Sequence, residues 1–263
     1  MKSTLPVVLI LSSTPLVAKA SSILSPEAES PAPQSSPSRY FTAPSAVPIE
    51  RGTGYISQKE LMVTQLAYGL TDHLSLMGAT SIPFATQGPL GVLGITGTLP
   101  LGDHLDIGAG VAYGGKKTFY SYAMHGMHGV APHAMITASW PWWNLTFATG
   151  FAAGTVDRYD DSWEVKNFIP SALAAQARIT ERFLIVAETW FVLRSMGEGY
   201  QGLGVRYSPH TRPWTIDVGV LSVLLTDTEK FPWVGPGYMA PYLDFSYDFG
   251  SRRMRPPASP PDE

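Results

Sequence analysis

The feature that most restricts the fold of this chain is a long series of segments in which apolar and polar side chains alternate. In "LDFSYDF" the apolar and aromatic residues fall on one parity, and the acids and serine fall on the other. This period of two predicts β-strands, because successive side chains of a strand point to opposite faces of the sheet. Eleven such segments lie between residues 53 and 249, and most run ten or more residues. Roughly nine to eleven residues cross a bilayer, whereas strands of globular proteins average about five or six.

The connections between these segments alternate in length, and this favours a membrane barrel over a soluble β-sandwich. Every second connection is a tight turn, and most of the others are longer loops such as "GKKTFYSYAMH" and "DRYDDSWEVK". Outer-membrane barrels have short turns at the periplasmic rim and longer loops at the outer rim. The tight turns lie at Thr71–His73, Gly102–Asp103, Pro141–Trp143, Glu181–Arg182 and Pro209–Pro213.

The strand count follows from this alternation, because an exported barrel with both ends in the periplasm needs an even number of strands. Eleven segments leave one strand missing, and "RYFTAPSAVPI" at Arg39–Ile49 is the candidate, with its prolines at a bulge or seam. We predict an all-β fold, a single antiparallel transmembrane β-barrel of about twelve strands, with ten as the alternative if the first strand and a neighbour are irregular. The last strand would then pair with Phe41–Val47, because an open edge has no hydrogen-bonding partner in hydrocarbon.

Both ends of the chain are predicted to lie outside the barrel of residues 39–249. Residues 1–20 are typical of a signal peptide, since Lys2 precedes an apolar stretch and Ala18-Lys19-Ala20 is a small-x-small cleavage site. Residues 21–38 are rich in Ser, Pro and Ala, which predicts a disordered linker. The charged, proline-rich residues 250–263 are predicted to form a disordered tail.

Composition argues against several classes of protein. The charged fraction is 15%, below the roughly 25% of soluble domains. A net charge of −3 without a Lys/Arg stripe argues against nucleic-acid binding. The chain has no cysteine, which excludes disulfides, thiolate metal sites and Cys nucleophiles. We expect no cofactor.

If the apolar parity faces lipid, a set of charged side chains must point into the lumen, because an Arg facing lipid near the midplane costs about 2–4 kcal/mol. Twelve strands enclose more space than the side-chain-filled eight-stranded barrel. The charges could line an aqueous path for small polar solutes, which predicts a passive porin-like channel. They could instead close the lumen as a paired network, which predicts a non-conducting structural or adhesion barrel. The predicted lumen-lining residues are Asp106, Arg178, Glu188, Arg206, Asp217 and Asp244.

The stretch "YSYAMHGMHGVAPHAM" is where the sequence offers other chemistry. His125 and His128, with methionines nearby, are weak candidates for metal ligands. A Ser/His pair here could serve an outer-membrane lipid-modifying enzyme, our third hypothesis. However, His128 and His133 differ in parity, and no adjacent carboxylate would orient an imidazole. We therefore expect neither a metal site nor enzymatic activity.

Four stretches resemble segments that recur in a family of Gram-negative outer-membrane β-barrel proteins: "FTAPSAVPIERGTGYISQ", "YGLTDHLSLMGATSIPF", "LIVAETWFV" and "GPGYMAPYLDFSYDF". The resemblance extends over most of residues 39–249 and implies a porin-like barrel in the cell outer membrane, without catalytic residues. A protein in that place would contact membrane lipid and lipopolysaccharide, and barrel-assembly machinery would insert it. Outer-membrane barrels usually end on an aromatic residue, but here fourteen residues follow Phe249.

Overall fold

The computed structural model describes residues 39–81, 90–120, 123–157, 163–193, 195–209, 212–224 and 239–250. The predicted signal peptide and linker, and the tail after Gly250, lie outside these residues. Every regular element in the described ranges is a β-strand. No helix long and apolar enough to cross a membrane occurs in this part of the chain.

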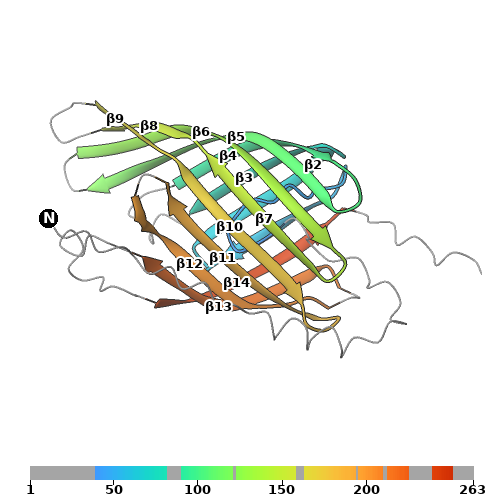
Figure 1. Cartoon of the computed structure of the whole chain (residues 1–263). Helices are drawn as coiled ribbons and strands as arrows, with labels where there is room; N and C mark the ends of the chain where they lie inside the picture. Colours follow the sequence, from blue (N-terminus) through green and yellow to red (C-terminus); the bar gives the residue numbers. More distant parts are fainter. Residues whose placement is uncertain are drawn as a thin grey trace, which may run out of the picture. The chain divides into compact units, whose positions relative to one another are not determined.

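The described strands form one antiparallel sheet that closes on itself (Figure 1). Each strand pairs with its neighbour along the wall, and closure comes from β5 pairing with β6 at one junction and β1 pairing with β14 at another. The strands are β1 (Gly54–Lys59), β2 (Val63–Thr71), β3 (Leu74–Ser81), β4 (Leu90–Pro100), β5 (Leu105–Tyr120), β6 (Ala123–Trp140), β7 (Trp143–Gly150), β8 (Ala152–Asp157), β9 (Trp163–Phe168), β10 (Pro170–Arg178), β11 (Phe183–Val192), β12 (Ser195–Tyr207), β13 (Trp214–Leu224) and β14 (Met239–Phe249).

Twelve strands make up the wall of the barrel, which confirms the predicted fold class and strand number. β7 and β8 pair with successive parts of β6 and are separated only by Phe151. β9 and β10 are likewise separated only by Ile169. β8 and β9 therefore extend two wall strands, and Figure 1 shows them, with β5 and β6, projecting at one end.

The prediction that residues 39–49 form the first strand is wrong. These residues carry no strand, and β14 pairs instead with β1, from Gly54 opposite Phe249 to Lys59 opposite Asp244. Prolines at positions 44 and 48 lack the amide hydrogen that a wall strand must donate. Consecutive side chains from Arg39 to Phe41 are all buried, whereas a wall strand would turn every second one to the outside.

The twelfth strand comes from the segment "TGYISQKELMVTQLAYGL", which folds as the β1–β2 hairpin rather than as one strand. Its turn places Glu60 and Leu61 at φ values of 53° and 58°, in the left-handed region. Such turns favour Asn-Gly, so Glu-Leu gave no sequence signal for a reversal. The turn is held against β14, where Glu60 N donates to Leu243 O at 2.7 Å and Leu243 N donates to Glu60 Oε1 at 3.0 Å.

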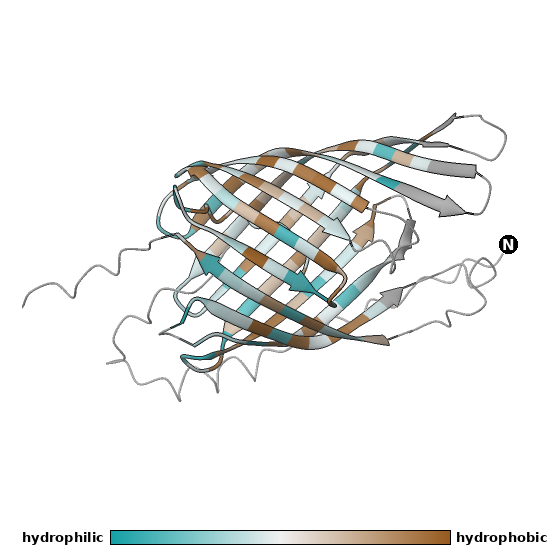
Figure 2. Cartoon of the chain, turned by 180° about the vertical axis from the view of Figure 1, so that it is seen from behind, coloured by the Kyte–Doolittle hydropathy of each residue, from teal (hydrophilic) through white to brown (hydrophobic). Residues whose placement is uncertain are grey.

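The outer surface of the barrel is apolar along the middle of the strands. Figure 2 shows hydrophobic and hydrophilic residues alternating along the strands in view. Leu203 is 59% exposed and Phe245 is 49% exposed, while Asp244 beside Phe245 is fully buried on the inner face. Trp140 and Trp143 stack at 4.3 Å beside a short turn, as expected for aromatic residues at a membrane interface.

Candidate functional site

A non-strand segment of the chain lies inside the barrel. We call residues Arg39–Ala46 the internal segment. Arg39, Tyr40, Phe41, Ala43 and Ala46 are each at most 6% exposed, although the segment takes no part in the sheet. Polar and apolar side chains on the inner faces of several strands surround it, so the candidate site is the contact between the segment and the wall.

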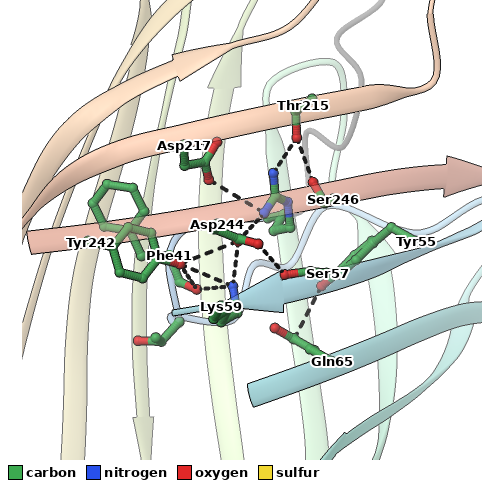
Figure 3. A network of polar contacts seen from close by, with 12 residues as sticks. Phe41, Tyr55, Ser57, Lys59, Gln65, Thr215, Asp217, Tyr242, Asp244 and Ser246 are labelled. Carbon is green, nitrogen blue, oxygen red and sulfur yellow. Dashed lines mark hydrogen bonds and ion pairs between the residues drawn. The ribbon is translucent and has the colours of Figure 1, made fainter. Parts of the chain in front are cut away.

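Four charged side chains stand next to one another on the inner face of four adjacent strands. We call Lys59, Asp244, Asp217 and Arg206 the charged stripe, on β1, β14, β13 and β12. The register places Lys59 opposite Asp244, Asp244 opposite Asp217, and Asp217 opposite Arg206. Figure 3 shows the first three of them side by side. Two carboxylates in direct opposition repel each other, so the stripe needs cations at close range.

Each carboxylate of the stripe binds the cation beside it, Arg206 at one end of the stripe and Lys59 at the other. Arg206 binds Asp217 through two parallel hydrogen bonds, Nε to Oδ1 at 2.7 Å and Nη2 to Oδ2 at 2.8 Å. Lys59 Nζ donates to Asp244 Oδ2 at 2.9 Å, and Ser57 Oγ donates to Oδ1 at 2.7 Å. The two parallel hydrogen bonds between Arg206 and Asp217 are the strongest form of ion pair available to Arg.

Arg39 of the internal segment bridges the two carboxylates from inside the lumen. Its Nη1 lies 2.5 Å from Asp244 Oδ2 and 3.4 Å from Asp217 Oδ2, and its Nη2 donates to Thr215 Oγ1 at 2.6 Å. Its guanidinium carbon lies 5.9 Å from the centre of the Tyr55 ring. These two ion pairs offset the cost of burying the positive charge of Arg39. Arg39 is therefore a charged anchor.

The next anchor is Phe41, which is fully buried. Its ring lies 4.5 Å from the ring of Tyr242, centre to centre. The other side of the ring approaches Gly202 and Gly204, where an added Cβ would lie 2.9 and 3.0 Å from ring atoms. The Phe41 carbonyl accepts hydrogen bonds from Lys59 Nζ and, at 3.3 Å, from Tyr242 Oη. Two glycines on β12 thus make room for one aromatic ring.

Glu188 on β11 holds the turn that follows Phe41. Its carboxylate accepts from the backbone amides of Thr42 at 3.0 Å and Ala43 at 3.1 Å, and from Thr42 Oγ1 at 2.7 Å. Trp190 Nε1 donates to Thr42 Oγ1 at 3.0 Å, and Tyr200 Oη also contacts that hydroxyl. One carboxylate therefore accepts from two consecutive amides that lie outside the sheet.

The segment also contacts the opposite wall, formed by β6 and β7. Tyr40 Oη donates to Asn144 Oδ1 at 2.6 Å and lies 2.8 Å from Thr146 Oγ1. The amide of Ala46 donates to Thr137 Oγ1 at 2.9 Å. The internal segment therefore crosses the lumen from β12–β14 to β6–β7.

The six predicted lumen residues divide into two groups. Glu188, Arg206, Asp217 and Asp244 are buried on the inner face and contact the internal segment. Asp106 and Arg178 are half-buried near the short-turn ends of β5 and β10. Arg178 lies in the row of the stripe, because it stands opposite Leu184 and Leu184 stands opposite Arg206. Two charged residues of the site, Arg39 and Lys59, are not among the predicted lumen residues. The sequence assigns Arg39 to a wall strand, and it gives no signal for the turn that follows Lys59. The inward parity that Lys59 shares with Tyr55 and Ser57 is the signal that could identify it.

The histidines do not come together as a site in the described part of the chain. His128 is exposed on β6, where its Nε2 lies 3.3 Å from Thr155 Oγ1. His133 lies on the opposite face, with Nε2 3.5 Å from Thr96 Oγ1. The side chain of His125 falls outside the described residues. Within the described ranges no group of three His, Cys, Asp or Glu residues could hold a metal ion.

Comparison with known proteins finds likenesses to solved structures only. The NanC porin matches with 8% identity over 76% of this chain and 98% of its own, at a TM-score of 0.48. The KdgM porin in complex with disordered oligogalacturonate matches with 9% identity over 75% and 98%, at 0.49. The translocator domain of the autotransporter NalP from Neisseria meningitidis matches with 8% identity over 75% and 87%, at 0.45. No family model and no curated protein matches the chain.

Proposed function

We propose that this protein is a porin-like outer-membrane channel whose lumen is closed at rest by its internal segment. The observation that carries the proposal is that Arg39–Ala46 crosses a polar barrel interior and is bound there by side chains of the wall. A segment held in this way can leave without breaking the sheet, because closure of the barrel depends on the pairing of β1 with β14.

The outer surface supports the membrane part of the proposal. Large apolar side chains such as Leu203, Val218 and Phe245 are 49–59% exposed, and inner-face neighbours such as Asp217 and Asp244 are fully buried. An apolar band outside and a polar interior are the pattern of a barrel in lipid. In this setting the band contacts membrane lipid, the outer rim contacts lipopolysaccharide, and barrel-assembly machinery inserts the chain.

Conductance across a planar bilayer tests the channel. The change is Glu188→Ala, which removes the carboxylate that holds the amides of Thr42 and Ala43. We expect the wild-type protein to be mostly closed and the variant to open at least ten times as often. Glu50→Ala is the matched control, because it removes an exposed carboxylate just beyond the segment and leaves the anchors in place. Conductance no greater than the lipid background in all three proteins would overturn the channel and favour the non-conducting barrel.

A reversible lock shows whether the current passes the internal segment. Ala46 Cβ lies 3.5 Å from the place where a Cβ at Gly108 would stand. This distance suits a disulfide, and the chain has no other cysteine to interfere. In the Glu188→Ala background, the pair Ala46→Cys and Gly108→Cys should lose conductance on oxidation and regain it on reduction. If conductance stays unchanged when the two cysteines are oxidised, the internal segment is not the gate.

A further inference from the structure

The wall recognises the internal segment partly through its main chain. Arg206 Nη1 donates to the carbonyl of Arg39 at 2.8 Å, and Tyr242 Oη donates to the carbonyl of Phe41 at 3.3 Å. Glu188 accepts from two consecutive amides of the segment. Every peptide carries these carbonyls and amides, so the same wall groups can bind a peptide that is not part of the chain.

The wall also provides three places for side chains. Asp217, Asp244 and Thr215 contact the guanidinium of Arg39, and Figure 3 shows these three wall residues near one another. The ring of Phe41 fits between Tyr242 and the glycines of β12. The hydroxyl of Tyr40 reaches Asn144 on the far wall. Arginine followed by two aromatic residues is therefore the side-chain pattern that fits this interior.

The arginine place is specific in its geometry. One nitrogen of Arg39 lies within 3.4 Å of both carboxylates, while a second nitrogen reaches the Thr215 hydroxyl. Lysine carries one compact ammonium group and lacks the planar fork that makes these contacts together. The site thus distinguishes the two basic side chains by shape, since both carry one positive charge.

We infer that the lumen is a binding site for short extended peptides that carry arginine followed by aromatic residues, and that the internal segment is its resident occupant. This inference rests on the proposed function, since it names the class of solute that displaces the gate. A free peptide of this kind takes the contacts of Arg39, Tyr40 and Phe41 when the segment leaves.

The test uses the full chain with the side-chain places emptied by Arg39→Ala and Phe41→Ala. The probe is the labelled synthetic peptide Arg-Tyr-Phe-Thr-Ala-Pro-Ser-Ala, capped at both ends, and fluorescence anisotropy reports binding in detergent. We expect the double variant to bind this peptide saturably. A peptide with Arg39→Lys or Phe41→Ala should bind the same variant at least ten times more weakly. The wild-type protein, whose own segment fills the site, should also bind the unchanged peptide at least ten times more weakly. In the comparison of peptides the change lies in the peptide, so the protein and its fold are the same in those arms.

Three results would overturn the inference: no saturable binding to the folded variant, equal binding of all peptides, or equal binding to the wild type. Heat-modifiable migration on gels establishes folding, and Phe41→Ala alone, which keeps the buried charges paired, replaces the double variant if that one does not fold. Binding without conductance would leave the peptide site standing and remove the channel. Conductance without peptide binding would support the channel and overturn the peptide site.

Discussion

Arg206 is the residue of the charged stripe whose removal has the most definite expected cost. The side chain is fully buried and binds both oxygens of Asp217. Arg206→Met removes both of these hydrogen bonds and leaves the carboxylate, within the described part of the chain, the longer ion pair with Arg39 at 3.4 Å. Breaking one side of a buried ion pair costs about 3–5 kcal/mol, so we expect the free energy of unfolding to fall by about that amount.

A double variant tests the ion pair between Arg206 and Asp217 as a unit. Arg206→Met combined with Asp217→Leu removes both charges and replaces them by apolar side chains, while Arg39 keeps Asp244 as its partner. Replacing a whole buried pair is often close to neutral, so we expect the double variant to recover most of the loss. If the two sites acted independently, the double variant would instead lose the sum of two such costs, about 6–10 kcal/mol.

Reversible urea unfolding in liposomes, followed by the fluorescence of the seven tryptophans, measures these differences. Arg182→Met is the control, because Arg182 is exposed at the short-turn rim and its loss should change stability by no more than about 0.5 kcal/mol. A cost below about 1 kcal/mol for Arg206→Met, or a double variant as unstable as the sum, would refute the buried charged stripe.

Three further predictions concern the wall, the segment and the tail. Phe245→Asp puts a charge on the outer face and should block stable membrane insertion, measured by heat-modifiable migration, whereas Phe245→Leu should insert; a soluble, folded Phe245→Asp protein would show that this face does not meet lipid. Gly202→Ala places a Cβ 2.9 Å from the Phe41 ring and should increase channel opening. The smaller side chain of Phe41→Leu should partly reverse this increase. Unchanged opening would refute the ring contact as an anchor. Removing Met254–Glu263 should leave heat-modifiable migration intact, and its loss would show that the tail assists insertion.

The inner and outer faces of the wall could be predicted because they depend on a local property. Side chains alternate along any strand, so the parity of Asp217 and Asp244 against Val218 and Phe245 indicated which residues share a face. The alternation of turn and loop lengths predicted an even-stranded barrel for a similar reason. The β1–β2 hairpin could not be found in this way, because Glu60 and Leu61 adopt left-handed conformations that their types do not favour.

The sequence by itself determined that the chain forms an even-stranded antiparallel barrel with an apolar outside, because period and turn spacing depend on neighbouring residues. The predicted number of twelve was correct, but the twelfth strand comes from the β1–β2 hairpin and not from residues 39–49. Only the tertiary structure decided the role of residues 39–46. Their composition fits an irregular edge strand as well as a bound peptide, and the choice depends on partners such as Asp244, which is 205 positions away from Arg39. Whether Arg39 faces lipid, water or two carboxylates is a property of the closed barrel, since only closure brings β12, β13 and β14 around the segment.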